Sequence, residues 1–217
     1  TGVLPEAVNE ALSGSVAWDG KVGIDLPYHA GATYNIELNG DLKNVSSHLP
    51  SPLAKPAGEP LAVNVKVDGN LNSFELTGQA GADNHFNSRW LLGQKLTLDR
   101  AIWAADSKTL PPLPEQSGVE LNMPPMNGAE WLALFQKGAA ESVGGAASFP
   151  QHITLRTPML SLGNQQWNNL SIVSQPTANG TLVEAQGREI NATLAMRAVA
   201  GEYQISLLQP ERGENSW

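Results

Sequence analysis

Hydrophobic residues occupy every second position along most of the chain. Between positions 61 and 67 the odd residues are Leu or Val and the even ones are mostly polar, and Tyr34, Ile36 and Leu38 alternate with Asn and Glu in the same way. A period of two is typical of β-strands with one apolar face. About twelve such runs, separated mostly by short polar turns, predict a mainly β protein.

The strands of such a sheet place their apolar side chains on one face. We expect on this face Val22, Ile24, Tyr34, Ile36, Leu38, Val63, Val65, Val67, Phe74, Leu76, Leu96, Leu98, Ile153, Leu155, Ile172, Leu194 and Met196. Two sheets could cover each other in a sandwich, one sheet could close into a barrel, or a single curled sheet could leave an open groove that needs a ligand. Alternation alone is compatible with all three.

Turn residues and proline-rich stretches separate the predicted strands. Asp68-Gly69-Asn70 and Asn179-Gly180 predict hairpin turns. Proline punctuates a loop at 48–60 and a stiff connector at 111–115.

One short helix is predicted at residues 128–142. Asn127 and Glu130 form a capping-box pattern at its start, and Trp131, Leu134 and Phe135 form one apolar face. Because the polar face carries few cations, we expect the helix to pack on the sheet and not on an anionic membrane.

Composition supports a β-rich fold and excludes some partners. Only 16% of the 217 residues are charged, whereas Asn, Gln, Ser and Thr together number 54. The formal net charge of −8, without a basic run, argues against nucleic-acid binding, which needs clustered Lys and Arg. The absence of cysteine excludes disulfides and thiol chemistry.

Candidate catalytic and metal-binding residues are sparse. Asp83 and His85 form the most metal-like pair, but a site needs further ligands, so we interpret them as a solvated turn. Ser142 lies in the nearest approach to a nucleophile motif, without the required glycine pattern. We therefore expect no catalytic residue, no cofactor and no metal site, and no enzymatic activity.

Two sequence blocks resemble the YhdP family of Gram-negative bacteria, which belongs to the AsmA-like proteins. One is residues 42–60, containing the pattern Leu-Pro-x-Pro-x-x-Lys-Pro-x-Gly, followed by a Val-rich run and Asp68-Gly-Asn-Leu71. The other is Phe86-Asn-Ser-Arg-Trp-Leu-Leu-Gly93. The resemblance covers residues 12–197.

The resemblance implies one long, curled, antiparallel β-sheet that forms an open apolar groove. Residues 1–217 would then be a single periplasmic segment of a larger protein anchored in the inner membrane. The apolar face would line a path for phospholipid between the inner and outer membranes, which maintains the outer-membrane barrier. Phospholipid would be the main partner, with envelope proteins at the ends of the full-length protein and membrane contact only through its other parts.

A second interpretation is a periplasmic scaffold that recruits envelope proteins through exposed strand edges. In that case the apolar faces would close into an ordinary sandwich core. The shape of the sheet distinguishes the two interpretations.

Overall fold

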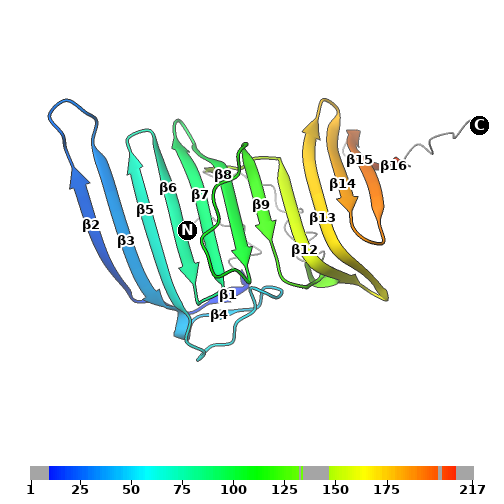
Figure 1. The fold of residues 1–217 in the computed structure, drawn as a ribbon, viewed down its shortest axis with the longest axis horizontal. Coiled ribbons are helices and arrows are strands. Elements are labelled where there is room, and N and C mark those ends of the chain that lie inside the picture. Colours follow the sequence, from blue (N-terminus) through cyan, green and yellow to red (C-terminus); the bar gives the residue numbers. More distant parts are fainter. Residues whose placement is uncertain (1–9, 132, 134–146, 200–201, 209–217) are drawn as a thin grey trace, which may run out of the picture.

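The computed structural model describes residues 10–131, 133, 147–199 and 202–208. They form a 14-stranded sheet and a separate 2-stranded sheet (Figure 1). In chain order, the strands are β1 (Leu12–Ser13), β2 (Trp18–Asp25), β3 (Thr33–Asp41), β4 (Ser46–Ser47), β5 (Ala62–Asn70), β6 (Ser73–Ala80), β7 (Asn84–Leu92), β8 (Leu96–Ala105), β9 (Gly118–Asn122), β10 (Met126–Asn127), β11 (Ala147–Ser148), β12 (Ile153–Leu162), β13 (Gln165–Thr177), β14 (Gly180–Gln186), β15 (Asn191–Val199) and β16 (Glu202–Leu208). A 3-10 turn spans Leu42–Asn44.

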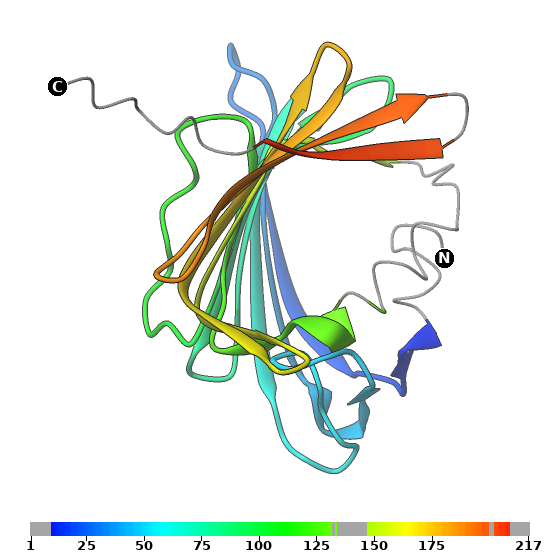
Figure 2. The same ribbon diagram turned by 90° about the vertical axis from the view of Figure 1, so that its right-hand side faces the viewer.

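The large sheet is curled and open. Its strands follow the order β16-β15-β14-β13-β12-β9-β8-β7-β6-β5-β3-β2, so β2 and β16 are the outer strands. Viewed along its length, the sheet has one concave and one convex face (Figure 2). The chain exposes 14662 Å², against roughly 9,700 Å² expected for a compact protein of this size. The predicted open groove is confirmed, and a closed sandwich or barrel is excluded.

We expected an antiparallel sheet, but part of the sheet is parallel. Strand β9 runs parallel to both of its neighbours, β8 and β12. Parallel neighbours need crossover connections, because the chain must return to the same end of the sheet before each strand. Residues 106–117 provide the first crossover and residues 123–152 the second.

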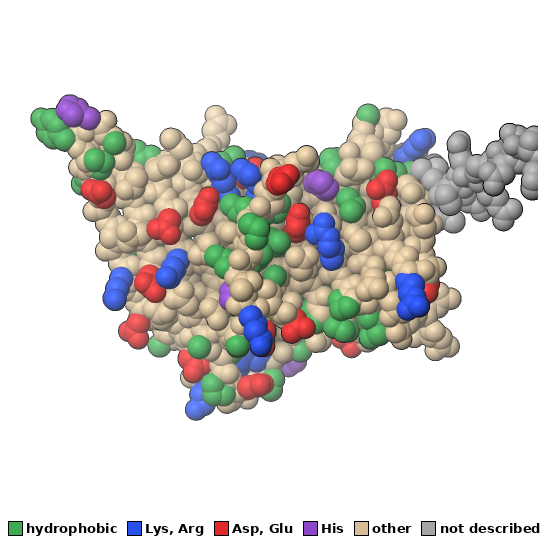
Figure 3. All heavy atoms as spheres, viewed as in Figure 1, with side chains coloured by type: hydrophobic (Ala, Val, Ile, Leu, Met, Phe, Trp, Pro, Cys, Tyr) green, Lys and Arg blue, Asp and Glu red, His purple; other side chains and the backbone are tan. Residues whose placement is uncertain are grey.

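The first crossover, which contains the connector 111–115, lies on the convex face (Figure 2). Three side chains of β7 and β8 bind its carbonyl oxygens. His85 Nδ1 lies 2.8 Å from the oxygen of Ser107, Asn87 Nδ2 donates to Pro111, and Arg100 donates to Pro114. The connector thereby covers Ile102 and Ala104, which are buried although they point away from the groove. Elsewhere this face is mostly polar and charged (Figure 3).

The second crossover starts and ends at opposite margins of the groove. Strand β10 pairs with β12 at Met126 and Leu160, and β11 pairs with β8 at Ala147 and Leu96. A helix begins at Gly128, as predicted, although most of the predicted range 128–142, including Ser142, lies outside the described residues.

The start of this helix is capped by Asn127. Asn127 Oδ1 accepts a hydrogen bond from the Ala129 backbone N–H at 3.1 Å, and Asn127 Nδ2 donates to Glu130 Oε1 at 3.1 Å. The first bond is that of an N-cap residue. The second joins the two side chains, whereas a capping box would join Glu130 to the backbone N–H of Asn127.

The loop that contains residues 48–60 forms the lower margin of the groove, as Figure 1 is oriented. Its strand β4 pairs with β1, and the Ser47 and Lys55 backbones pair across the loop. Asp41 Oδ1 accepts from the backbone N–H groups of Lys43 and Leu61, which holds the two ends of the loop together.

One hairpin turn lies further along the chain than predicted. Gly69 and Asn70 belong to β5, and the turn is made by Leu71 and Asn72. Asn70 Oδ1 accepts from the backbone N–H of Asn72 at 2.8 Å, so the Asn side chain makes the turn that we had assigned to Gly69. The hairpin at Asn179-Gly180 is confirmed between β13 and β14.

Candidate functional site: an apolar groove

The strand register places all seventeen predicted face residues on the concave face. Residues paired across neighbouring strands point to the same side of a sheet. Val22 pairs with Ile36, Ile36 with Val67 and Val67 with Leu76. A β-bulge between Arg89 and Trp90 shifts the pairing with β8, which keeps Leu96 and Leu98 on the same side.

One continuous line of paired residues crosses the sheet at mid-height, and we call it the middle row. It consists of Val22, Ile36, Val67, Leu76, Ser88, Ala101, Val119, Ile153, Ser174, Val183 and Leu194. At about 4.8 Å per strand, the row is roughly 48 Å long. It runs across the strands, along the axis of the groove.

Apolar side chains of the concave face are accessible to solvent at the β2 end. Val22 is 66% and Ile24 68% exposed, and Trp18 is also exposed. Among the described residues, no strand pairs with the outer edge of β2. A contiguous exposed apolar surface of this kind marks a site of interaction with a ligand, membrane or protein.

Glycines keep the floor of the groove shallow beside its aromatic rings. The Phe86 ring lies over Gly78 in the neighbouring strand, where a Cβ would collide with it. Tyr34 lies over Gly69 in the same manner. These rings therefore lie along the floor and do not stand up into the open space.

A pocket of about 630 Å³ lies where the lower margin meets the floor. Leu49 and Leu53 from the loop face Phe86 and Trp103 from the sheet across it. The Lys55 ammonium donates to the carbonyl oxygens of Val45 and Pro56, at 2.9 and 3.1 Å, and so fastens the loop. The pocket is mainly apolar and within the size range of small-molecule sites.

Beside this pocket, a buried cluster fills the lower part of the groove. Ala105, Met123 and Met126 form its centre, and Trp103, Leu121, Trp131, Leu155 and Leu160 pack around it. The predicted packing of the helix on the sheet is thus confirmed for its first turn, through Trp131.

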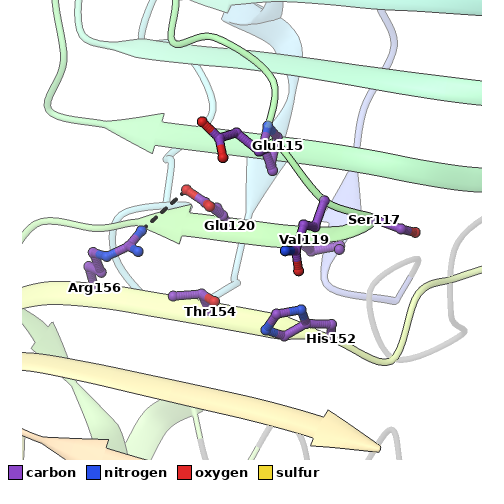
Figure 4. Close-up of a pocket in the computed structure, with 10 residues that line it drawn as sticks. Glu115, Ser117, Val119, Glu120, His152, Thr154 and Arg156 are labelled. Atoms are coloured by element: carbon purple, nitrogen blue, oxygen red, sulfur yellow. Dashed lines mark hydrogen bonds and ion pairs between the residues drawn. The ribbon is translucent and has the colours of Figure 1, made fainter.

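A second hollow, of about 330 Å³, lies on the convex face between the connector and strands β9 and β12 (Figure 4). Glu120 and Arg156 point toward each other there and form an ion pair of 3.2 Å. The Ser117 hydroxyl, at its margin, donates to the carbonyl oxygen of Asp99 at 2.8 Å. These three side chains are thus engaged with each other or with the backbone.

Asp83 and His85, the most metal-like pair in the sequence, do not form a metal site in the described residues. Asp83 lies in an exposed turn, as predicted, but His85 is in β7 and only 6% exposed, so the solvated-turn interpretation was wrong for it. Its ring binds the first crossover instead. Within the described residues, no group of three or more His, Asp or Glu could hold a metal ion.

The sequence prediction missed several residues of the groove face. Val119 and Leu121 belong to it through pairing with β8 and β12, but β9 is short and follows a proline-rich stretch. Phe86 and Trp90 alternate with Asn87 and Arg89, and this signal could have placed them on the face. Trp103 lies in an apolar run at 101–105, where alternation does not distinguish the two faces.

The comparison with known families agrees with the geometry of the sheet. The family model described as YhdP protein matches residues 2–208. The chain belongs to the YhdP family. The match extends beyond the resemblance over 12–197 and includes β16. Membership in the YhdP family places the chain among bacterial envelope proteins and suggests a role related to lipid transport.

Two further findings concern this YhdP-family chain. No solved structure matches it. None of the helices in the described part of the chain has the length and apolar character needed to span a bilayer.

Proposed function

We propose that this chain is part of a periplasmic bridge, anchored in the inner membrane, that moves phospholipids between the inner and outer membranes and so maintains the outer-membrane barrier. It acts as a conduit and not as an enzyme. The observation that carries the proposal is the middle row, a mainly apolar line on the floor of an open groove, together with membership in the YhdP family.

The energy of lipid transfer explains why an open groove is useful. A diacyl lipid has on the order of 30 methylene groups, and at ~0.8 kcal/mol each their exposure to water costs roughly 25 kcal/mol. A continuous apolar surface removes most of this cost without a chemical step, because the acyl chains stay in contact with hydrocarbon along the path.

The two faces of the sheet suit this role in different ways. On strand β5 the concave side carries Val63, Val65 and Val67, and the convex side carries Asn64 and Lys66. Acyl chains would occupy the concave side. The headgroup would remain at the open mouth of the groove, where water solvates its charge.

Partner proteins belong to the same proposal. Envelope proteins would bind the ends of the full-length protein, where lipid enters and leaves the groove. In this proposal the chain lies in the periplasm, and only other parts of the full-length protein contact the membranes.

Site-specific photo-crosslinking in cells tests the proposal. A benzophenone amino acid at Ile36, on the concave face, should crosslink phospholipid in the intact protein, as detected by mass spectrometry. The same group at Glu37, the next residue on the convex face, is the matched control and should give little lipid adduct. Equal lipid yields at both positions, or none at either, would contradict the proposal.

A further inference from the structure

The middle row changes character where it crosses β7 and β8. Most positions carry Val, Ile or Leu, but the row here consists of Ser88 and Ala101. Large aromatic residues lie on both sides of these small ones. Phe86 and Trp103 lie toward the lower margin, and Trp90 lies toward the opposite one, which we call the upper margin.

Trp90 leans from its own position over the middle row. Its indole Nε1 donates to the hydroxyl of Ser88, two residues back on the same strand, at 3.0 Å. The Ser88 hydroxyl in turn lies 3.2 Å from the carbonyl oxygen of Leu76. Ser88 is only 8% exposed, although its face is the open one, so the floor of the groove is covered at this point.

Two further rings hold the indole in this orientation. Phe74, on β6, is nearly parallel to Trp90, with ring centroids 6.1 Å apart and an interplanar angle of 11°. Phe149 contacts the indole edge-on, with centroids 6.3 Å apart. Such aromatic pairs are favourable beyond the burial of their area, so the indole has a defined position.

The groove is narrowed from both margins at these strands. Strand β11 pairs with β8 at Leu96 and brings Phe149 to the upper margin. The cluster of Met123, Met126 and Trp131 fills the lower part beside Trp103. The small floor residues and the indole over them therefore lie between two packed margins.

We propose that Trp90 determines the depth at which acyl chains cross β7 and β8. This inference rests on the proposed lipid path. Chains lie on the floor at Leu76 on one side and at Val119 on the other, and pass over the indole between them.

Photolabelling along the middle row tests the inference. The intact purified protein is equilibrated with vesicles of phosphatidylethanolamine that carries a diazirine at the end of one acyl chain, and labelled residues are identified by peptide mass spectrometry. We expect labelling of Leu76 and Val119 to exceed that of Ser88 and Ala101 several-fold. Trp90→Ala should remove most of this difference by exposing the floor.

Two variants serve as controls. Leu91→Ala shortens the adjacent side chain on the convex face and should leave the pattern unchanged. Ser88→Ala removes the acceptor of the indole N–H without removing a ring, so it tests the inference even if Trp90→Ala fails to fold, and it should raise labelling at Ala101.

The outcomes separate this inference from the proposed function. Equal labelling of Leu76, Ser88 and Ala101 in the unaltered protein would overturn the role of Trp90 while supporting the lipid path. An unchanged pattern in folded Trp90→Ala, or in Ser88→Ala where Trp90→Ala does not fold, would also overturn it. Absence of label anywhere on the concave face would instead contradict the lipid path itself.

Discussion

The indole Nε1 of Trp131 donates a hydrogen bond to the carbonyl oxygen of Ser51, 3.0 Å away and 80 positions earlier in the chain. Ser51 lies in the proline-rich loop, and Trp131 lies in the first turn of the helix that follows β10. The bond joins two segments that the sheet itself does not connect. The lower margin of the groove is therefore a single packed unit, in which the loop supports the helix and the helix supports the loop.

Replacing Trp131 should destabilise this margin. A fully buried Trp→Ala change costs about 3–5 kcal/mol. Because Trp131 is half-buried, we expect Trp131→Ala to lower the free energy of unfolding by about 2 kcal/mol. Trp131→Phe keeps a ring in the cluster but loses the indole N–H, so it should cost about 1 kcal/mol. Urea unfolding measures both, and an unchanged midpoint for Trp131→Ala would show that the margin does not contribute to stability.

A charge on the groove floor should block transport without unfolding the protein. Val65 is half-buried and lies between Leu38 and Gly78 of the neighbouring strands. Val65→Asp places a carboxylate where acyl chains pass, and a passing chain must desolvate it or avoid it. We expect a loss of folding stability of about 1–3 kcal/mol, normal protein levels and a failed outer-membrane barrier.

Lys66→Glu provides the matched control for this test. Lys66 is exposed on the opposite face of the same strand, so its charge reversal should leave both protein level and barrier intact. Detergent sensitivity of cells, measured beside immunoblots, distinguishes the outcomes. Folded, abundant and fully active Val65→Asp is the result that would contradict a lipid path over β5.

Removing the His85 ring should loosen the first crossover and spare the groove. His85 is buried and its Nδ1 contacts the carbonyl oxygen of Ser107. His85→Ala leaves that carbonyl without this partner, which costs about 1–3 kcal/mol where the group stays buried. Hydrogen exchange should increase at the amides of residues 106–117, while barrier function persists in the folded protein. Loss of the barrier in a stable His85→Ala variant would instead assign this residue a functional role.

The loop between β14 and β15 should respond to acid through Glu189. Hydrogen bonds from the Asn168 side chain and then the Asn168 backbone N–H hold the pKa of the Glu189 carboxyl below its usual value of 4.5. The stabilisation from a lowered carboxyl pKa is fully present above the usual value and is lost as the pH falls through the folded-state value. Asn168→Ala should raise the pKa of Glu189 toward 4.5. An NMR titration of the carboxyl carbon checks this, and an unshifted pKa in the variant would count against the hydrogen bonds as its cause.

The faces of the sheet could be predicted from the sequence because strand geometry has a period of two. Tyr34, Ile36 and Leu38 face the groove whichever strands lie beside them, since alternation within one strand fixes the side. The order of the strands needs information that alternation does not contain. Strand β9 has only Val119 and Leu121 as apolar alternating positions, and its parallel pairing depends on contacts with distant parts of the chain.

The burial of His85 and the position of Trp90 also depend on tertiary contacts. The burial of His85 follows from the first crossover, which covers its strand, and nothing in the local sequence of β7 signals that contact. The position of Trp90 over Ser88 depends on Phe74 and Phe149, which come from different strands and segments. The capping interaction at Asn127 was predictable, because it is made by residues within one turn of each other.

The parallel pairing of β9 divides the sheet into parts that form at different speeds. Strands β5 to β8 and β12 to β16 are successive hairpins, and a hairpin closes in about 1–10 μs. The contacts of β9 must wait for residues 106–117 and 123–152 to bring distant strands together, and such non-local pairing is slow. Until β9 pairs, strands β5 to β8 and strands β12 to β16 would form two separate parts of the sheet. The apolar side of each part would be uncovered, and the edges of β8 and β12 that bind β9 would be unpaired. The pairing of β9 is the step at which a newly made chain is most exposed to aggregation, and at which a chaperone would have the most effect.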